Sequence, residues 1–343
     1  TTGKPKGAEL THFNLYYNAQ HVCERSCSNW PQEINILGPG HVALAALPLF
    51  HIFGQTNVQN ALLFGGGSIS YLRRFYAREA VKVIVRDAVT FFPGVPTMFF
   101  EILYNAETRD SDLSNLQHCI CGGGPMPREV KRRFEDRFNV NIQEAYGLTE
   151  TSPLTSHQRK NETSKCGTIG KPIAGVEMQV VNEEGRQVSQ GERGEIVIRG
   201  HNIMKGYYKN PKATARAFRG GWFHSGDIGY VDEDGDFVIV DRKKELILRG
   251  GYNVYPREVE EVLYGHPAIR EAAVIGVPDE RLGEEVKAVV SLQADSQVTA
   301  KEIQQYCKVH VAAYKYPRLV DILENLPKSS TGKILKRVLR EKG

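Results

Sequence analysis

The chain has 343 residues, of which 41 % are hydrophobic and 24 % are charged. This composition is typical of a globular protein with two or more domains, and it argues against a disordered chain and against a membrane protein. The formal net charge is +4, with no basic stripe interleaved with aromatic residues, so an anionic ligand is favoured over a nucleic acid. The six cysteines form neither a C-x-x-C pair nor a zinc-like cluster, which fits a reducing cytosol.

The first 160 residues alternate between short apolar runs and helical patterns. Helices are expected at 10–27, 52–64, 77–86, 96–105 and 127–138, and strands at 42–47, 68–72, 89–92, 118–121 and 142–145. The strand at 89–92 should end at Pro93-Gly94. This alternation predicts a mostly parallel sheet with helices on its faces.

The pattern changes twice after that. Residues 165–240 are rich in glycine and in short alternating strands, which predicts a small antiparallel barrel or sandwich. The remainder reads as a compact α+β unit with expected elements at 256–264, 271–277, 285–292, 299–311 and 318–322. The predicted fold is therefore α/β. A large domain over 1–241 (α/β to 160, barrel-like over 161–241) precedes a smaller α+β domain over 242–343, with a hinge at 241–244.

The chain opens with the motif TTGKPKG (1–7). Its Gly, Pro and Thr residues favour a tight turn whose backbone N–H groups can face an anion, and Lys6 adds a mobile positive charge. It is not the motif of P-loop NTPases, because Gly7 follows Lys6 where Ser or Thr is required. A solvated tail is the alternative interpretation.

Two glycine-bearing loops follow predicted strands. In CGGGP (121–125) the three glycines leave room for a ligand plane or an acyl chain, or simply form a tight turn. The motif YGLTET (146–151) comes where a parallel sheet usually places its ligand crevice. There Gly147 lets a flat ring approach the backbone, Thr149 offers a hydroxyl to phosphate, and Glu150 offers a hard oxygen ligand to Mg²⁺. A polar loop with a helix N-cap is the alternative.

Three further motifs lie in the second half. In GWFHSGD (221–227) the carboxylate of Asp227 follows a turn and suits ribose hydroxyls, unless it is an exposed turn residue. The charged run DRKKE (241–245) lies where two regions join, so it is either a solvated face or a hinge. In PKSSTGK (327–333) Lys333 is carried on a glycine-bearing loop, from which it either reaches a distant site or remains an ordinary surface lysine.

The order and spacing of these motifs, from TTGKPKG through YGLTE, GWFHSGD and DRKKE to GKILKR, resemble the adenylate-forming superfamily of acyl-CoA synthetases, luciferases and peptide-synthetase adenylation domains. The phrases LPLFHIFGQT (47–56), VTFFPGVPTMFFEIL (89–103) and LRGGYNVYPREVEEVL (248–263) are most similar to bacterial long-chain fatty-acid–CoA ligases. The resemblance implies that a carboxylate attacks the α-phosphate of ATP, giving acyl-adenylate and pyrophosphate, and that the thiol of CoA then displaces AMP. It implies ATP, Mg²⁺ and CoA as cofactors and co-substrates.

The resemblance also implies roles for residues of the predicted large domain. Thr149 would contact phosphate and Glu150 would hold Mg²⁺, while His51 matches a gate beside the pantetheine tunnel or is a core histidine. The loop over the β- and γ-phosphates would contain Thr1, Thr2, Gly3 and Lys6. The walls of the adenine site and of the acyl pocket would contain Gly122, Gly123, Gly124, Ala145, Tyr146 and Gly147.

Later in the chain, the resemblance implies that Asp227 and Arg242 hold the ribose hydroxyls and that Lys333 bridges the carboxylate and the α-phosphate. The C-terminal domain would swing about a hinge at Lys244, which removes Lys333 and brings Gly250-Gly251 in to line the pantetheine tunnel.

Two departures from the family pattern stand out. The residues that usually precede TTGKPKG, with a large N-terminal part of the first domain, are missing. We therefore expect exposed apolar faces and strand edges, and a chain that is poorly soluble or inactive alone. Leu248 stands where many luciferase-like and coumarate-type members carry Lys, which favours the fatty-acyl branch.

The nature of the acid stays open at this level. An aryl-acid CoA ligase, a carrier-protein adenylation module and an inactive nucleotide-binding fragment are the alternatives to a fatty-acid ligase. An apolar pocket wall or ordinary core is suggested by Phe91, Phe92, Val95, Met98 and Phe99. The expected partners are small molecules and not nucleic acid. The expected location is cytoplasmic, without a membrane span, although peripheral membrane contact and a homodimer are compatible with the sequence.

Overall fold

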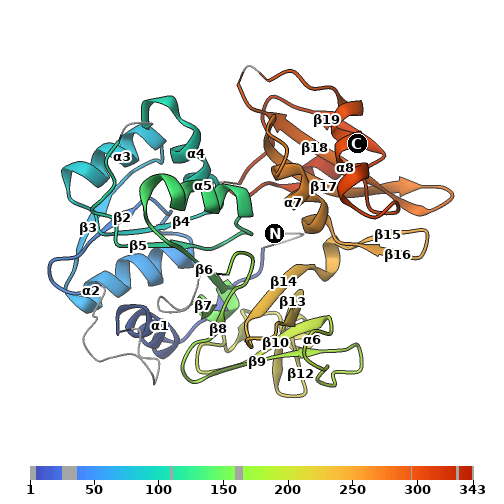
Figure 1. Ribbon diagram of the computed structural model, residues 1–343. Helices are drawn as coiled ribbons and strands as arrows, with labels where there is room; N and C mark the ends of the chain where they lie inside the picture. The colour runs from blue at the N-terminus through green and yellow to red at the C-terminus, as the bar shows by residue number, and fades with distance from the viewer. Residues whose placement is uncertain are drawn as a thin grey trace. The chain divides into compact units, whose positions relative to one another are not determined.

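The computed structural model describes residues 5–24, 37–108, 111–158, 165–294, 296–329 and 332–341. The chain forms two compact units (Figure 1). The first holds the residues up to Ser225 together with Tyr230–Val238, and the second holds Gly226–Gly229 and the residues from Ile239 onward. The predicted boundary at 241 stays a prediction of domain organisation.

The first unit is built around a seven-stranded sheet. Its spatial order is β3 (Ser68–Tyr71), β2 (Val42–Ala45), β4 (Phe91–Gly94), β5 (His118–Cys121), β6 (Ile142–Gly147), β7 (Leu154–His157) and β8 (Lys171–Pro172). The pairs from β3 to β6 are parallel, and β7 and β8 continue the sheet antiparallel. The predicted mostly parallel sheet is therefore confirmed.

Helices cover both faces of this sheet. Those of one face are α3 (Ala77–Arg86), α4 (Pro96–Tyr104) and α5 (Arg128–Phe138), and those of the other are α1 (His12–Glu24) and α2 (Ala61–Gly65) (Figure 1). The expected helix at 52–64 is a π-helix over Phe53–Asn60 that continues into α2. The end of the expected helix at 10–27 lies outside the described residues.

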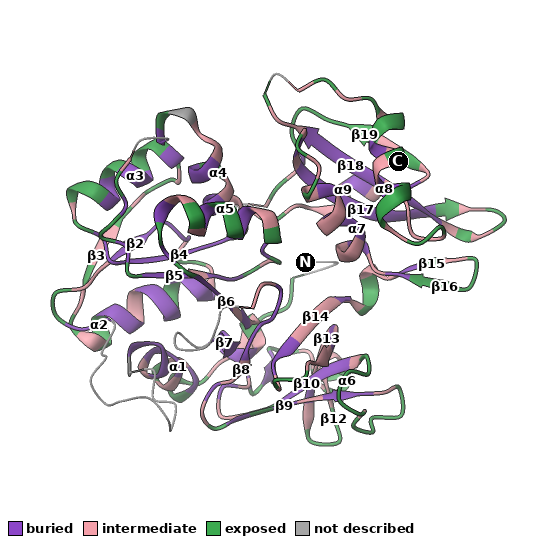
Figure 2. Ribbon diagram, in the orientation of Figure 1, coloured by how far each residue is buried: buried purple, intermediate pink, exposed green. Residues whose placement is uncertain are grey.

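The core beneath α4 and α5 is aromatic. The ring of Phe99 lies 4.8 Å from Phe92 and 5.2 Å from Phe134, between centroids, and all three side chains are fully buried. Strand β4 is buried along its length, and β5 is buried except at the half-buried Ile120 (Figure 2). Of the two interpretations of Phe91, Phe92 and Phe99, the structure therefore favours ordinary core.

The strand β4 corrects one prediction. The sequence placed a strand at 89–92 that ends at Pro93-Gly94, whereas β4 runs over Phe91–Gly94 and includes both residues. Proline has no N–H to donate to a sheet. Pairing with β5 nevertheless continues from Phe91 to Gly94, while pairing with β2 on the other side involves Phe91 alone.

A second sheet follows in the region predicted as barrel-like. Its order is β12 (Phe218–Arg219), β13 (Trp222–Val231), β10 (Gly194–Gly200) and β9 (Val176–Val181), with β14 (Phe237–Arg242) paired to β13. A separate antiparallel pair joins β1 (Ala8–Glu9) to β11 (Gly206–Tyr207), and α6 (Pro211–Ala217) follows β11. This small pair ties the start of the chain to residues two hundred positions later.

The second unit is α+β, as predicted. Its sheet has the order β16 (Tyr252–Val254), β15 (Ile247–Arg249), β18 (Gly283–Leu292) and β17 (Ile269–Asp279), with β19 (Leu319–Ile322) parallel to β18. Its helices are α7 (Pro256–Tyr264), α8 (Ala300–His310) and α9 (Lys336–Glu341).

The middle of strand β17 is buried on both faces, which explains the apolar run at 272–277. Val274 packs in one cluster with residues of α7 and α8, and Ile275 packs in the other with Leu339 of α9. Within the residues that the structure describes, no helix is long and apolar enough to cross a membrane.

Candidate active site

The glycine-rich loop after β5 lies against its neighbours with little room. The N–H of Gly122 donates to the carbonyl of Gly94 at the end of β4, over 3.1 Å. A β-carbon on Gly122 would lie 3.2 Å from the Phe53 ring and 3.4 Å from the carbonyl oxygen of Ala145. The carboxyl ends of β4, β5 and β6 therefore meet here, where parallel sheets place ligands.

Gly147, the last residue of β6, fits only because it has no side chain. A β-carbon there would lie 1.9 Å from the carbonyl oxygen of Pro153. The following N–H, of Leu148, donates to that same oxygen over 3.1 Å and to the hydroxyl of Thr151 over 2.9 Å. These bonds fix the loop, with Thr149 exposed and Glu150 half-buried. Ala145 and Tyr146, immediately before it, pair with β7.

Glu150 has a defined partner. The hydroxyl of Tyr207 donates to its Oε1 over 2.7 Å, and the N–H of Met204 donates to its main-chain carbonyl over 2.8 Å. In the described part of the chain, Oε2 makes no hydrogen bond or ion pair. Burial, and next the bond to Glu150, raise the pKa of Tyr207, so its hydroxyl remains a donor.

Lys6 lies beside the same tyrosine. Its Nζ is 4.1 Å from the centroid of the Tyr207 ring. Strand pairing aligns Ala8 with Tyr207, and the N–H of Tyr208 donates to the carbonyl of Gly7 over 2.7 Å. Lys6 and Glu150, which the sequence assigned to phosphate and Mg²⁺, therefore both contact the side chain of Tyr207. Thr1, Thr2 and Gly3, predicted for the same loop, lie outside the described residues.

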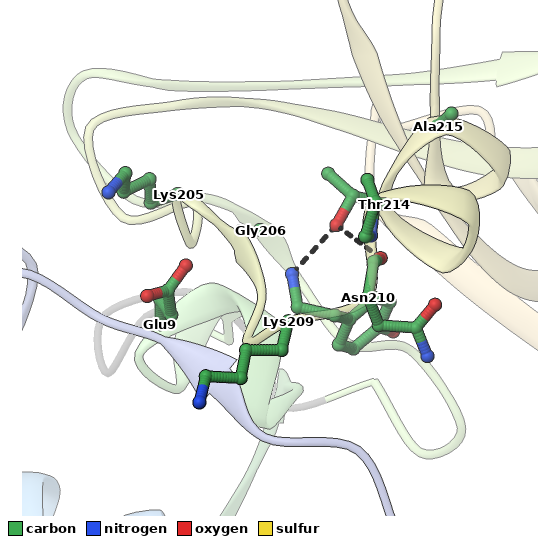
Figure 3. A pocket seen from close by; sticks show the side chains of 9 residues that line it. Glu9, Lys205, Gly206, Lys209, Asn210, Thr214 and Ala215 are labelled. Atoms are coloured by element: carbon green, nitrogen blue, oxygen red, sulfur yellow. Dashed lines mark hydrogen bonds between the residues drawn. The ribbon is translucent and has the colours of Figure 1, made fainter.

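A pocket of about 380 Å³ opens on the α6 side of β11 (Figure 3). Figure 3 shows Glu9, Lys205 and Lys209 along it, with Asn210 and Thr214 of the α6 region opposite. Thr214 is already hydrogen-bonded to the main chain on both sides, accepting from Tyr207 and donating to Asn210. The hydroxyl of Tyr207 contacts Glu150 instead of this pocket's polar groups.

His51 opens the turn that leads into the π-helix. It is half-buried, and its Nδ1 lies 3.3 Å from the N–H of Phe53. The ring of Phe53 packs against Gly122 in the glycine-rich loop after β5. His51, two residues before Phe53, is therefore close in sequence to a residue that contacts this loop. Phe53 was not a sequence candidate, and an apolar residue after a histidine gives no signal by itself.

In the second unit, Asp227 and Arg242 form an ion pair. Nε of Arg242 lies 2.8 Å from Oδ1 of Asp227, and Asp227 is only 2 % exposed. Asp227 therefore lies within strand β13 and is not the exposed turn residue that was the alternative interpretation. A buried carboxylate of this kind needs its cation, because an unpaired charge is costly to desolvate.

Lys333 belongs to the same charged group. Desolvation lowers its pKa most, and repulsion by Arg242 lowers it further, against attraction by Glu245 and Asp227. Its loop is held by main-chain bonds with Ser329, and Gly332 supplies a left-handed turn at φ +80°. Lys244 is exposed, and desolvation followed by repulsion from Arg242 lowers its pKa as well.

Lys336, at the start of α9, was missed by sequence reasoning. Its Nζ lies 2.7 Å from Glu260 of α7 and 3.5 Å from Glu245, just after β14. Desolvation opposes its charge, but Glu260, Asp241 and Glu245 together raise its pKa. It therefore fastens the loop of Lys333 to the segment of Lys244. The sequence did not predict this role, because Lys336 is one of several basic residues in and around α9.

Gly250 and Gly251 form the turn of the β15–β16 hairpin. Both have left-handed backbones, at φ +56° and +84°, and both are exposed. The N–H of Gly250 donates to the carbonyl of Leu282 over 2.8 Å. Leu248, two residues before Gly250 in β15, is 55 % exposed and so is not a core residue.

Glu150 is the one carboxylate that the sequence assigned to a metal. No group of three or more His, Cys, Asp or Glu side chains suited to a metal ion occurs within the described ranges. Mg²⁺ usually keeps several waters and binds one or two carboxylates together with substrate phosphates. Glu150, with Oε2 available, fits that mode of binding.

Comparison with known proteins identifies related chains. The model of the family described as AMP-binding enzyme matches residues 1–208, and that of the AMP-binding enzyme C-terminal domain matches residues 258–333. A long-chain-fatty-acid–CoA ligase of Bacillus subtilis (strain 168) is 40 % identical over 342 residues, covering 99 % of this chain and 60 % of the relative. A feruloyl-CoA synthase of Amycolatopsis sp is also 40 % identical, covering 100 % of this chain and 68 % of the relative.

The fold is similar as well. The crystal structure of ATP-bound MatB from Rhodopseudomonas palustris superposes with a TM-score of 0.90 at 31 % identity, covering 99 % of this chain and 66 % of MatB. This chain thus spans 60–68 % of the length of these three proteins. The chain belongs to the AMP-binding enzyme family, within the adenylate-forming superfamily.

Proposed function

We propose that the protein activates a carboxylic acid with ATP to an acyl-adenylate and transfers the acyl group to CoA. The observation that carries this proposal is the grouping of Lys6 and Glu150 at Tyr207, beside the Gly147 loop. A cation and a hard carboxylate oxygen at the carboxyl end of a parallel sheet suit the triphosphate of ATP. Relatives named as CoA ligases support the second half of the reaction.

The chemistry explains why these residue types are needed. An attacking carboxylate and an α-phosphate are both anionic, so catalysis depends on positioning and on charge neutralisation. Mg²⁺, held by Glu150, would supply positive charge to the phosphates. Lys6 and the hydroxyl of Thr149 would bind phosphate oxygens, and the exposed position of Thr149 leaves it accessible.

The second unit would act on the other reacting groups. Asp227 and Arg242 would hold the ribose hydroxyls, and Lys333 would neutralise the attacking carboxylate and the α-phosphate. Desolvation and Arg242 lower the pKa of Lys333, and the negative charges of the bound carboxylate and α-phosphate would oppose that shift and keep the ammonium group charged. Thioester formation would then use a hinge at Lys244, the Gly250-Gly251 turn and the gate at His51.

We infer that the acid is a long-chain fatty acid, and an aryl acid is the second candidate. The fatty-acid ligase of Bacillus subtilis supports the first, and the feruloyl-CoA synthase supports the second at the same identity of 40 %. Leu248, at a position where many luciferase-like and coumarate-type members carry Lys, agrees with the fatty-acyl branch. The buried Phe91, Phe92 and Phe99 belong to the core and do not discriminate between the two.

Acid-dependent release of pyrophosphate, with ATP and Mg²⁺, tests the proposal. Because this chain spans only 60–68 % of the length of its relatives, the assay uses both this chain and a version extended to their full length. A panel from acetate through palmitate to coumarate and ferulate should show turnover that rises with alkyl length, with loss of turnover in Lys333→Ala. A maximum at ferulate or coumarate would establish the aryl acid instead. Binding of AMP without acid-dependent pyrophosphate release would contradict the ligase proposal and leave a nucleotide-binding protein.

A further inference from the structure

Tyr207 contacts both groups that the proposed function assigns to the triphosphate end of ATP. We propose that Tyr207 is a positioning residue that orients the carboxylate of Glu150 for Mg²⁺ and the ammonium of Lys6 for phosphate. This inference rests on the proposed function. Nothing in the sequence motifs assigned a role to Tyr207, which stands between a lysine-glycine pair and another tyrosine.

The hydroxyl acts on Glu150. Its 2.7 Å bond to Oε1 has an ionised acceptor, and such bonds are short and stronger than those between neutral groups. The bond to Oε1 fixes the rotation of the carboxylate group about the last side-chain torsion of Glu150. Without such a bond, this torsion takes a broad range of angles. The remaining oxygen, Oε2, has no partner in the described part of the chain. The hydroxyl therefore selects which carboxylate oxygen is presented to the metal ion.

The ring acts on Lys6. The ammonium lies 4.1 Å from the ring centroid, within the range of a cation–π contact. Lysine has a flexible stem with several rotatable bonds and loses rotamer entropy when its position is fixed. Since Lys6 is otherwise exposed and makes no ion pair among the described residues, the ring of Tyr207 is what limits its range of positions.

Tyr207 can position other groups because it is itself held. It is 8 % exposed, its N–H donates to the hydroxyl of Thr214 over 2.9 Å, and β11 pairs with β1 on the other side. Asn210 caps α6 by accepting from the N–H of Ala213 over 3.0 Å. The tyrosine is therefore fixed to both the start of the chain and a capped helix.

The two contacts are separable by mutation. Tyr207→Phe removes only the hydroxyl, whereas Tyr207→Leu removes the ring face as well. Tyr208→Phe is the matched control, because Tyr208 is the adjacent residue, is 58 % exposed and makes no side-chain hydrogen bond among the described residues. ATP binding by calorimetry, with Mg²⁺ and with EDTA, gives a readout that does not depend on turnover.

We expect Tyr207→Phe to weaken ATP binding about tenfold in Mg²⁺ and to leave it unchanged in EDTA. Glu150→Gln should lose the same Mg²⁺ dependence, and the double variant Tyr207→Phe/Glu150→Gln should bind no more weakly than Glu150→Gln. Tyr207→Leu and Lys6→Met should both weaken binding in EDTA as well, and Tyr208→Phe should match the original chain in both conditions.

Equal Mg²⁺ dependence in Tyr207→Phe and the original chain would overturn the inference, as would additive losses in the double variant. Thermal unfolding separates positioning from folding, because Tyr207→Phe retains the buried ring and its Tm should stay within a few degrees. If the original chain itself bound no ATP, the proposed function would fall together with the inference. ATP binding that is insensitive to Tyr207→Phe would remove the inference alone.

Discussion

The sites around Glu150 and Lys333 are held in different ways. Glu150 lies in a loop fixed by main-chain bonds around Gly147, and a neutral tyrosine hydroxyl orients its carboxylate. Lys333 lies on a short loop whose following helix is anchored by an ion pair between Lys336 and Glu260. A main-chain scaffold changes little with pH, whereas an ion-pair anchor depends on protonation. The first site should therefore be sensitive to steric substitutions and the second to charge and pH.

The largest effect should come from Lys333→Ala. Removing one preorganised charge from a transition state costs about 10²–10³-fold in rate. We expect that loss in acid-dependent pyrophosphate release, with the Tm unchanged, because Lys333 is exposed. Transfer from a supplied acyl-adenylate to CoA should survive. An equal loss in both half-reactions would contradict the assignment of Lys333 to the first step.

Gly147→Ala should destabilise the first unit by about 2–4 kcal/mol, because its β-carbon would overlap the Pro153 carbonyl at 1.9 Å. Gly124→Ala is the matched control, since its β-carbon would meet nothing closer than 3.8 Å. Denaturant unfolding measures the difference. Similar stability of the two variants would mean that the loop after β6 is less constrained than its bonds indicate.

Lys336→Met should destabilise the second unit by about 2–3 kcal/mol, because it leaves the buried carboxylate of Glu260 without its cation. Adding Glu260→Gln should recover part of that loss, since the unpaired charge is then removed. Pyrophosphate release should fall less than in Lys333→Ala. If the double variant is no more stable than Lys336→Met, the ion pair does not account for the effect.

The smallest effect is the pH dependence of the contacts that Lys336 makes with Glu260 and Glu245. The pKa of Lys336 is raised in the folded protein above its ordinary 10.5, so its contribution is present below pH 10.5 and is lost as the pH rises through the raised value. The pKa of Glu245 is lowered despite desolvation, mainly by Lys336, so its contribution is lost only as the pH falls below about 4.5.

The stability difference between the original chain and Lys336→Met should therefore be flat over pH 6–9 and shrink above pH 10.5. Urea unfolding at each pH measures it. A difference that stays constant up to pH 12 would show that Lys336 acts through packing of its alkyl chain and not through its charge.

Sequence patterns predicted most elements because each pattern has a local cause. The apolar runs at 118–121 and 142–145 became β5 and the first part of β6, and the periodic pattern at 77–86 became α3 with the same bounds. The ends of strands were harder to predict. Pro93 lies inside β4, although the sequence predicted that the strand would end before it. The end of a strand depends on which neighbouring strand pairs with it, and β4 pairs with β5 through Pro93 but with β2 only at Phe91. The motifs predicted the candidate residues, and their roles in binding and catalysis stay predictions.

What the sequence determined by itself was the local chemistry: glycines where chains approach closely, and lysines and carboxylates of the right type in a recognisable order. Only the tertiary structure decided which of them meet. Tyr207 lies 57 residues from Glu150 and about two hundred from Lys6, and no local pattern encodes their contact. The same holds for Lys336 and Glu260, since pairing between distant segments is set by sheet register and helix packing, which are properties of the whole fold.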